Sequence, residues 1–250
     1  MKKVKVLVLK TAGTNNDVET AQAFNLAGGV PEIVHINKFL SKENDLRRYQ
    51  ILAIPGGFSY GDDISAGKIF ANKLKYQLRD NLMEFVKEKK LIIGICNGFQ
   101  VLVKSGIFPF MDSRQSVTLK WNDSGKFECR WVHLRTVQGS GFRVQSSKSG
   151  IQSLWLRGLP EIIQLPVAHA EGNFYATEET VDKLERSGMV VLKYCDEMGN
   201  DAGYPCNPNG SIRNIAGIVN PEGNIFALMP HPERFVTKYQ HPSWTRNEKT

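Results

Sequence analysis

Short apolar runs alternate with helical stretches throughout the N-terminal part of the chain. The runs cover residues 4–9, 32–36, 51–54 and 91–95. Apolar residues recur at helical spacing in residues 17–26, and a long helical region is expected from about residue 66 to residue 89. Strands that are apolar on both faces belong to parallel sheets covered by helices. The pattern therefore predicts an α/β fold with a mainly parallel central sheet flanked by helices.

The C-terminal half adds strands of a different kind. Residues 117–121 and 127–137 flank the turn sequence Asn-Asp-Ser-Gly, and this arrangement predicts an antiparallel hairpin. Further strands are expected at residues 162–169, 189–194, 215–219 and 225–229, with a turn joining the last two. No repeat, low-complexity stretch or linker interrupts the chain. We therefore expect a single domain over residues 1–250, with antiparallel additions to the parallel sheet.

Charge and hydropathy exclude several classes of protein. The net charge is +7, but the basic residues are scattered and are not interleaved with aromatic residues as in a binder of single-stranded nucleic acid. These basic residues are expected to be ordinary solvated surface, and the alternative is that they form a docking face for an acidic protein. No apolar run approaches the ~20 residues of a membrane-spanning helix. The short N-terminal run has no cleavage site after it, so it indicates a strand rather than a signal peptide. We expect a cytoplasmic protein that binds neither nucleic acid nor membrane.

Residues 94–98 have the sequence Gly-Ile-Cys-Asn-Gly between a predicted strand and a predicted helix. The form G-x-C-x-G in this context is typical of a nucleophile elbow, whose tight turn needs glycine on both sides. Cys96 would then lie at a helix N-terminus, where the helix dipole favours the thiolate. The alternative is a buried, inert cysteine, and we assign that state to Cys129, Cys195 and Cys206. No two cysteines have C-x-x-C spacing, so no zinc or redox motif is expected.

A cysteine nucleophile needs a base, and His231 is the best candidate among the five histidines. It follows the last apolar strand in the sequence Pro-His-Pro-Glu. The flanking prolines disfavour a helix, and in an extended segment residues i and i+2 point to the same side. We therefore expect Glu233 to orient the ring of His231. A loop histidine beside a chance glutamate is the alternative.

The oxyanion of an acyl-transfer reaction is usually held by backbone N–H groups. The N–H of Asn97, directly after the nucleophile, is one expected donor. Gly57 is the expected second donor, since Gly56 and Gly57 follow a predicted strand and let the backbone approach a substrate. An ordinary glycine-rich turn is the alternative. Residues 61–63, Gly-Asp-Asp, indicate a turn rather than a metal site, and no phosphate-binding loop is present.

Three segments, residues 55–57, 94–100 and 230–233, resemble the signatures of class I (triad) glutamine amidotransferases. That family has the same chain order of Cys, His and Glu. Residues 127–132, 166–172 and 204–211 are further similar to the glutaminase subunits of phosphoribosylformylglycinamidine synthases. The resemblance implies a flavodoxin-like fold and hydrolysis of glutamine to glutamate. It also implies that ammonia passes through a tunnel to a separate synthetase subunit in de novo purine synthesis, often with a small third subunit. ATP and Mg would belong to the synthetase, and this chain would hold no cofactor.

The resemblance also assigns residues around the substrate. It places Gly56 and Gln100 near the bound glutamine, and His169 with Glu171 near the site entrance or a partner contact. Ala170 stands where the family more often has glycine, which affects the local backbone rather than the chemistry. Three alternatives stay open: a glutaminase that serves a different synthetase, a stand-alone cysteine hydrolase, and a non-catalytic docking protein.

Overall fold

The computed structural model describes residues 3–137, 151 and 153–246. Within these residues, one nine-stranded sheet has the order β2-β1-β3-β4-β11-β10-β9-β6-β7. Its strands are β1 (Lys5–Lys10), β2 (Val30–His35), β3 (Ile51–Ile54), β4 (Leu91–Ile95), β6 (Glu128–Thr136), β7 (Ile162–His169), β9 (Val190–Cys195), β10 (Ile215–Val219) and β11 (Ile225–Leu228). A separate two-stranded antiparallel sheet joins β5 (Thr118–Lys120) to β8 (Asn173–Tyr175).

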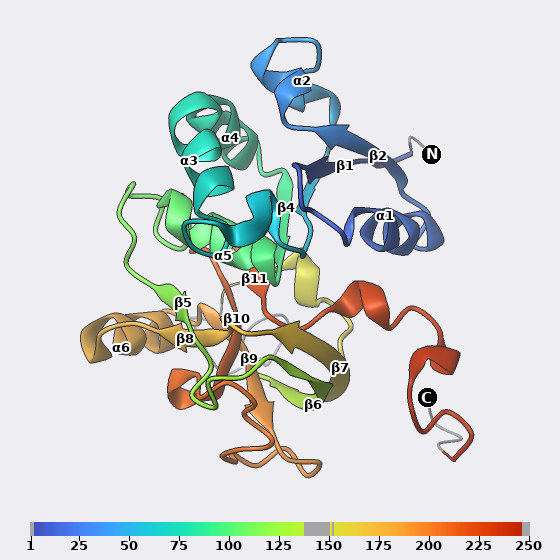
Figure 1. Cartoon of the computed structure of the whole chain (residues 1–250), viewed down its shortest axis with the longest axis vertical. Coiled ribbons are helices and arrows are strands. Elements are labelled where there is room, and N and C mark those ends of the chain that lie inside the picture. The colour runs from blue at the N-terminus through green and yellow to red at the C-terminus, as the bar shows by residue number, and fades with distance from the viewer. Residues whose placement is uncertain (1–2, 138–150, 152, 247–250) are drawn as a thin grey trace.

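The parallel half of the sheet, β2-β1-β3-β4-β11, is covered by helices on both faces (Figure 1). The chain moves in one direction from β1 to β2 and in the other from β3 to β4, so right-handed crossovers put the connecting helices on opposite faces. The helices are α1 (Asp17–Leu26), α2 (Asn37–Leu40), α3 (Lys68–Gln77), α4 (Arg79–Lys87), α5 (Asn97–Ser105) and α6 (Glu178–Arg186). The predicted mainly parallel α/β fold with antiparallel additions is confirmed.

The helical region expected over residues 66–89 is present as two helices, α3 and α4, which meet at Leu78, a 5% exposed side chain. One prediction about local structure is wrong. The hairpin expected around residues 122–125 does not form, because β5 pairs with β8 while β6 pairs with β7 and β9. The turn itself is present, with the Gly125 N–H donating to the Asn122 carbonyl at 2.8 Å, but it passes the chain from one sheet to the other.

The turn expected between the last two strands is present and joins them as a hairpin. β10 and β11 are antiparallel neighbours, and β11 lies parallel to β4 on its other side. The connecting turn is held by Asn220, whose side-chain oxygen accepts the Ile225 N–H at 2.8 Å. This hairpin brings the segment after β11 to the same sheet edge as the end of β4. In the described part of the chain, no helix has the length and apolar character needed to cross a membrane.

Candidate active site

The elbow forms at the carboxyl end of β4. Cys96 has φ 51° and ψ −106°, a backbone conformation that L residues adopt only when the surrounding structure imposes it. A Cβ at Gly98 would lie 1.9 Å from the carbonyl oxygen of Ile54, and one at Gly94 would lie 2.8 Å from the Gly98 carbonyl oxygen. The two glycines therefore let α5 start directly against the ends of β3 and β4, which keeps Cys96 at the sheet edge.

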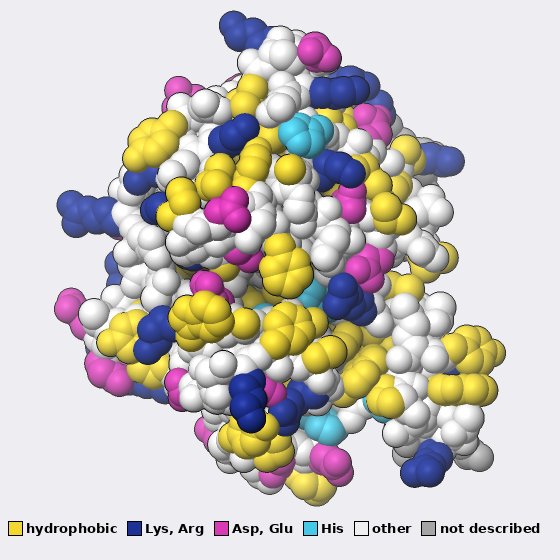
Figure 2. All heavy atoms as spheres, viewed as in Figure 1, with side chains coloured by type: hydrophobic (Ala, Val, Ile, Leu, Met, Phe, Trp, Pro, Cys, Tyr) yellow, Lys and Arg dark blue, Asp and Glu magenta, His cyan; other side chains and the backbone are white. Residues whose placement is uncertain are grey.

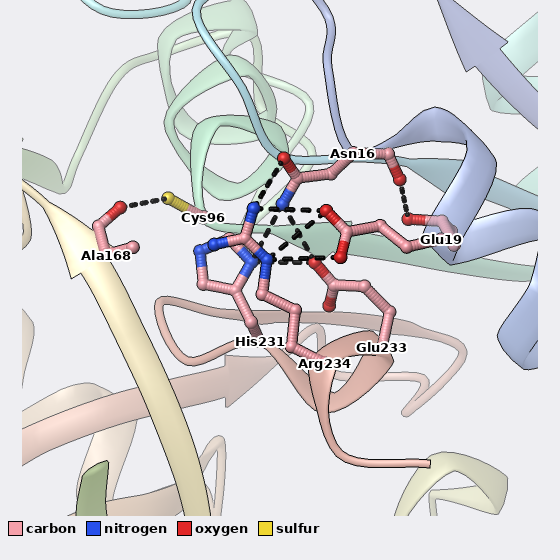
Figure 3. A network of polar contacts seen from close by, with 8 residues as sticks. Asn16, Glu19, Cys96, Ala168, His231, Glu233 and Arg234 are labelled. Carbon is pink, nitrogen blue, oxygen red and sulfur yellow. Dashed lines mark hydrogen bonds and ion pairs between the residues drawn. The ribbon is translucent and has the colours of Figure 1, made fainter. Parts of the chain in front are cut away.

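His231 and Glu233 meet Cys96 from the segment that follows β11 (Figure 3). The Nδ1 atom of His231 lies 2.7 Å from Oε1 of Glu233, and both side chains are buried. The segment is not extended as predicted, because residues Pro232–Arg234 form a 3-10 turn. Proline is accepted in the first turn of a helical segment, since no N–H is needed there. Glu233 nevertheless faces the ring, so the predicted contact is present.

The protonation of His231 follows from these contacts. An N–H at Nδ1 donates to the Glu233 carboxylate, so the proton exchanged with Cys96 is carried at Nε2. Nε2 is buried and has no hydrogen-bond partner among the described residues. Burial lowers the pKa of His231, but the neighbouring Cys96 sulfur and the Glu233 carboxylate outweigh burial and raise this pKa to about 10. The contacts of His231 with Cys96 and Glu233 therefore favour the protonated form of its ring.

The Cys96 thiol has a second neighbour. Its Sγ lies 3.7 Å from the carbonyl oxygen of Ala168, on β7. Figure 3 shows Cys96 between Ala168 on one side and His231 on the other. The nucleophile thus lies between the end of β4, in the parallel part of the sheet, and β7, in its antiparallel part.

The two expected oxyanion donors lie on neighbouring strand ends. Asn97 is the first residue of α5, where backbone N–H groups lack partners within the helix. Its side-chain oxygen accepts the Ser59 N–H at 3.3 Å, which ties the elbow to the loop after β3. Gly57, in that loop, has φ 130°, and a Cβ there would lie 2.7 Å from the Asn15 nitrogen. Only glycine fits this position.

A pocket of about 510 Å³ opens over Cys96. Such a volume lies in the range of small-molecule sites. Its lining includes Gly57, Cys96, Gln100, His169, Glu171 and His231. Three exposed aromatic residues, Phe58, Trp121 and Phe127, also line it. Hydrophobic side chains gather across the middle of the face seen in Figure 2.

Comparisons with known proteins agree with this geometry. Residues 3–250 match the family model of the CobB/CobQ-like glutamine amidotransferase domain. The chain belongs to the class I glutamine amidotransferase family. It is 47% identical over 246 residues to the phosphoribosylformylglycinamidine synthase subunit PurQ of Dehalococcoides mccartyi, covering 98% of this chain and 90% of that protein. The PurQ of Methanococcus maripaludis is 42% identical, with 96% of this chain and 85% of that protein covered.

A solved structure is similar over the same length. The structure of PurLQS from Thermotoga maritima contains a chain that is 30% identical to this amidotransferase, with a TM-score of 0.69. The match covers 96% of this chain and 92% of that chain. The resemblance proposed from the sequence motifs is therefore confirmed.

The substrate residues implied by the resemblance lie in or beside the amidotransferase pocket, but two are already engaged by the protein. Gln100 donates from Nε2 to the Glu171 carbonyl at 2.6 Å and accepts at Oε1 from Asn97 at 2.9 Å. His169 is 3% exposed and lines the pocket, and its Nδ1 lies 3.2 Å from Oδ1 of Asn122. Burial, and to a lesser extent the charge of His231, lower the pKa of His169 to about 3 and keep its ring neutral.

Sequence reasoning misjudged or missed other residues near the site. Cys129, expected to be buried, is exposed and lines the pocket, whereas Cys195 is buried as expected. Asn16, which no sequence motif singled out, contacts both His231 and Glu233. The Asp62 carboxylate, at the end of the 3-10 segment Ser59–Asp62, accepts the Gly67 N–H at 3.0 Å.

Gly56 offers a direct test of how tightly the site is packed. A Cβ at this position would lie 2.9 Å from Cε1 of His231 and 3.4 Å from Cβ of Cys96. Gly56→Ala should displace the imidazole and lower kcat for glutamine hydrolysis by about 100-fold, since small misplacements of reacting groups have effects of this size. Steady-state assay of glutamate release would check this, and a kcat within a factor of about two of the parent would contradict the geometry.

Proposed function

We propose that this chain is the cytoplasmic glutaminase subunit of a phosphoribosylformylglycinamidine synthase and consists of one amidotransferase domain. It hydrolyses glutamine and delivers ammonia to an ATP-dependent synthetase subunit in de novo purine biosynthesis, with a small third subunit in the complex. The main support is the buried Cys96–His231–Glu233 arrangement at a nucleophile elbow. The PurQ relatives and the PurLQS structure support the choice of synthetase.

The proposed reaction begins at Cys96. Its thiol gives a proton to Nε2 of His231, and the sulfur attacks the side-chain amide carbon of glutamine. The N–H groups of Gly57 and Asn97 hold the oxygen that becomes negative. The imidazolium then gives its proton to the leaving nitrogen, so the C–N bond breaks and ammonia is released. A glutamyl thioester remains on Cys96.

The second half of the reaction restores the enzyme. His231 accepts a proton from water, and the resulting hydroxide attacks the thioester carbon through a second oxyanion. The C–S bond breaks, glutamate leaves, and Cys96 recovers its proton from His231. Glu233 keeps the ring of His231 oriented and stabilises the imidazolium in both halves. The chain needs no cofactor of its own for these steps, and ATP and Mg act in the synthetase subunit.

The proposal is tested by measuring glutamate release from glutamine. The chain would be assayed alone and then with the synthetase subunit, the small third subunit, ATP, Mg and formylglycinamide ribonucleotide. We expect slow release alone and a marked rise in the full mixture. Activation by a different synthetase instead would favour that alternative. Equal activity with and without any partner, on amides other than glutamine, would favour a stand-alone hydrolase.

Glu233→Gln tests the orienting carboxylate. The carboxylate stabilises the imidazolium and so contributes to the raised pKa of His231. Its removal should lower that pKa, so the imidazolium is lost at a lower pH and the alkaline limb of kcat/KM moves to lower pH. We expect kcat to fall by about 100-fold or more while KM changes little. A pH profile of glutamate release measures both effects, and an alkaline limb that moves upward would contradict the assigned role.

A further inference from the structure

Asn16 directly precedes α1, at the helix N-cap position. An asparagine at this position commonly accepts a hydrogen bond from an N–H of the first helical turn. Here the backbone starts the helix, since the Asn16 carbonyl accepts the Thr20 N–H at 3.0 Å, but the side chain makes no capping bond. The residue is nevertheless 1% exposed. Its buried amide must therefore be satisfied elsewhere.

The Asn16 amide is directed at the triad. Nδ2 donates to Oε1 of Glu233 at 3.0 Å and lies 3.1 Å from Nδ1 of His231. Because Nδ1 already carries the proton donated to Oε1, the Asn16 N–H bonds to the carboxylate and not to the ring. Oε1 thus receives two hydrogen bonds, whereas Oε2 of Glu233 is buried with no partner among the described residues.

A second layer fixes the orientation of this amide. Oδ1 of Asn16 accepts a hydrogen bond from Nη2 of Arg234 at 3.1 Å. The same guanidinium binds both carboxylate oxygens of Glu19, with Nη2 3.0 Å from Oε1 and Nε 3.2 Å from each oxygen (Figure 3). A flipped amide would place its oxygen against the Glu233 carboxylate and its NH₂ group against the guanidinium. Only one orientation is therefore compatible with these charges.

We propose that Asn16, oriented by Arg234 and Glu19, is a positioning residue that holds the Glu233 carboxylate on Nδ1 of His231. The terminal torsion of a glutamate is broad and two-fold, so nothing intrinsic to Glu233 selects one oxygen for the ring. Asn16 removes this freedom by anchoring Oε1. The inference rests on the proposed roles of Cys96, His231 and Glu233, and it assigns a catalytic consequence to a residue from the opposite end of the chain.

Asn16→Leu in the assembled complex is the first test. The substitution removes the donor while keeping a side chain of similar size. We expect kcat for glutamine-dependent synthesis to fall about 10- to 100-fold, the effect of losing one hydrogen bond to a charged group. KM for glutamine should change little, and ammonia-dependent synthesis should be unaffected because the synthetase is intact. Asn25→Leu, the same change at an exposed position of α1, is the matched control and should retain parental kcat.

Two further variants keep the test independent of folding defects. Asn16→Asp preserves shape and can cap α1, but it lacks the donor and adds a second carboxylate beside Glu233; it should lose activity as well. Glu19→Gln changes a partly exposed ion pair, so the variant should fold normally and lower kcat by only about 2- to 5-fold. Parental kcat in both Asn16 variants would overturn the inference.

A double-mutant cycle separates positioning from a general structural effect. If Asn16 acts through Glu233, Asn16→Leu should lower kcat by less than about 3-fold when Glu233→Gln is already present. An equal loss in both backgrounds would overturn the inference, because Asn16 would then act without Glu233. The outcome is distinct from failure of the proposed function, which would appear as retained glutamine hydrolysis in Cys96→Ala.

Discussion

Cys96→Ala is expected to abolish glutamine-dependent synthesis by the complex while leaving ammonia-dependent synthesis intact. The loss of glutaminase activity should be at least about 10⁴-fold, since no other group can form the thioester once the sulfur is removed. The synthetase subunit makes the product from ammonia, so ammonium salts should restore turnover. The two activities would be measured on the same purified complex with glutamine or ammonium chloride.

The control for this prediction is Cys206→Ala. Cys206 is partly buried in a loop and does not line the pocket over Cys96, so its replacement should leave both activities unchanged. Glutamine-dependent synthesis that survives in Cys96→Ala would remove the cysteine from the mechanism. Loss of both activities in that variant would contradict the division of labour between the two subunits.

Gly98→Ala is expected to have the largest effect on stability. The added Cβ would lie 1.9 Å from the carbonyl oxygen of Ile54 and 2.8 Å from its carbonyl carbon. Both atoms belong to the backbone of β3, so α5 must move away from the sheet to relieve the contact. Alanine would otherwise favour a helix over glycine by about 1 kcal/mol, and the steric clash therefore reverses the usual sign.

We expect Gly98→Ala to lower the free energy of unfolding by about 3 kcal/mol or more. For a domain of this size the corresponding fall in Tm is roughly 6–12 °C. Thermal or urea unfolding followed by circular dichroism would measure it. Gly203→Ala is the matched control, because Gly203 has no heavy atom within 4 Å of an added Cβ. A Tm of Gly98→Ala equal to that of the control would show that α5 does not approach β3 as described.

Local patterns were sufficient for the parallel half of the fold and for the elbow. The strand predicted at residues 51–54 matches β3, and the one at 91–95 matches β4, because a buried parallel strand must be apolar on both faces. The G-x-C-x-G spacing identified Cys96, since the start of α5 requires glycine at position 94 and the adjacent end of β3 requires it at position 98. His231 and Glu233 were found together because they are two residues apart.

Local sequence patterns could not predict contacts between distant segments. The partner of β5 is β8, more than 50 residues away, and a turn sequence cannot specify which strand its flanks will join. The burial of His169 likewise depends on Asn122 and Asn209, which approach its ring from other loops. The helical region is divided into α3 and α4 at Leu78, and no neighbouring proline or glycine in the sequence indicates this division.

Asn16 shows both what local sequence patterns determine and what only contacts between distant segments determine. The helical spacing of residues 17–26 correctly predicted the bounds of α1, which begins directly after Asn16. Only the tertiary structure decided what its side chain does, because Glu233 and Arg234 reach it through the pairing of β11 with β4. The sequence determined where strands, helices and the nucleophile lie, since these depend on neighbouring residues. The tertiary structure decided which polar groups share the interior, because a buried donor takes whichever acceptor the packing brings to it.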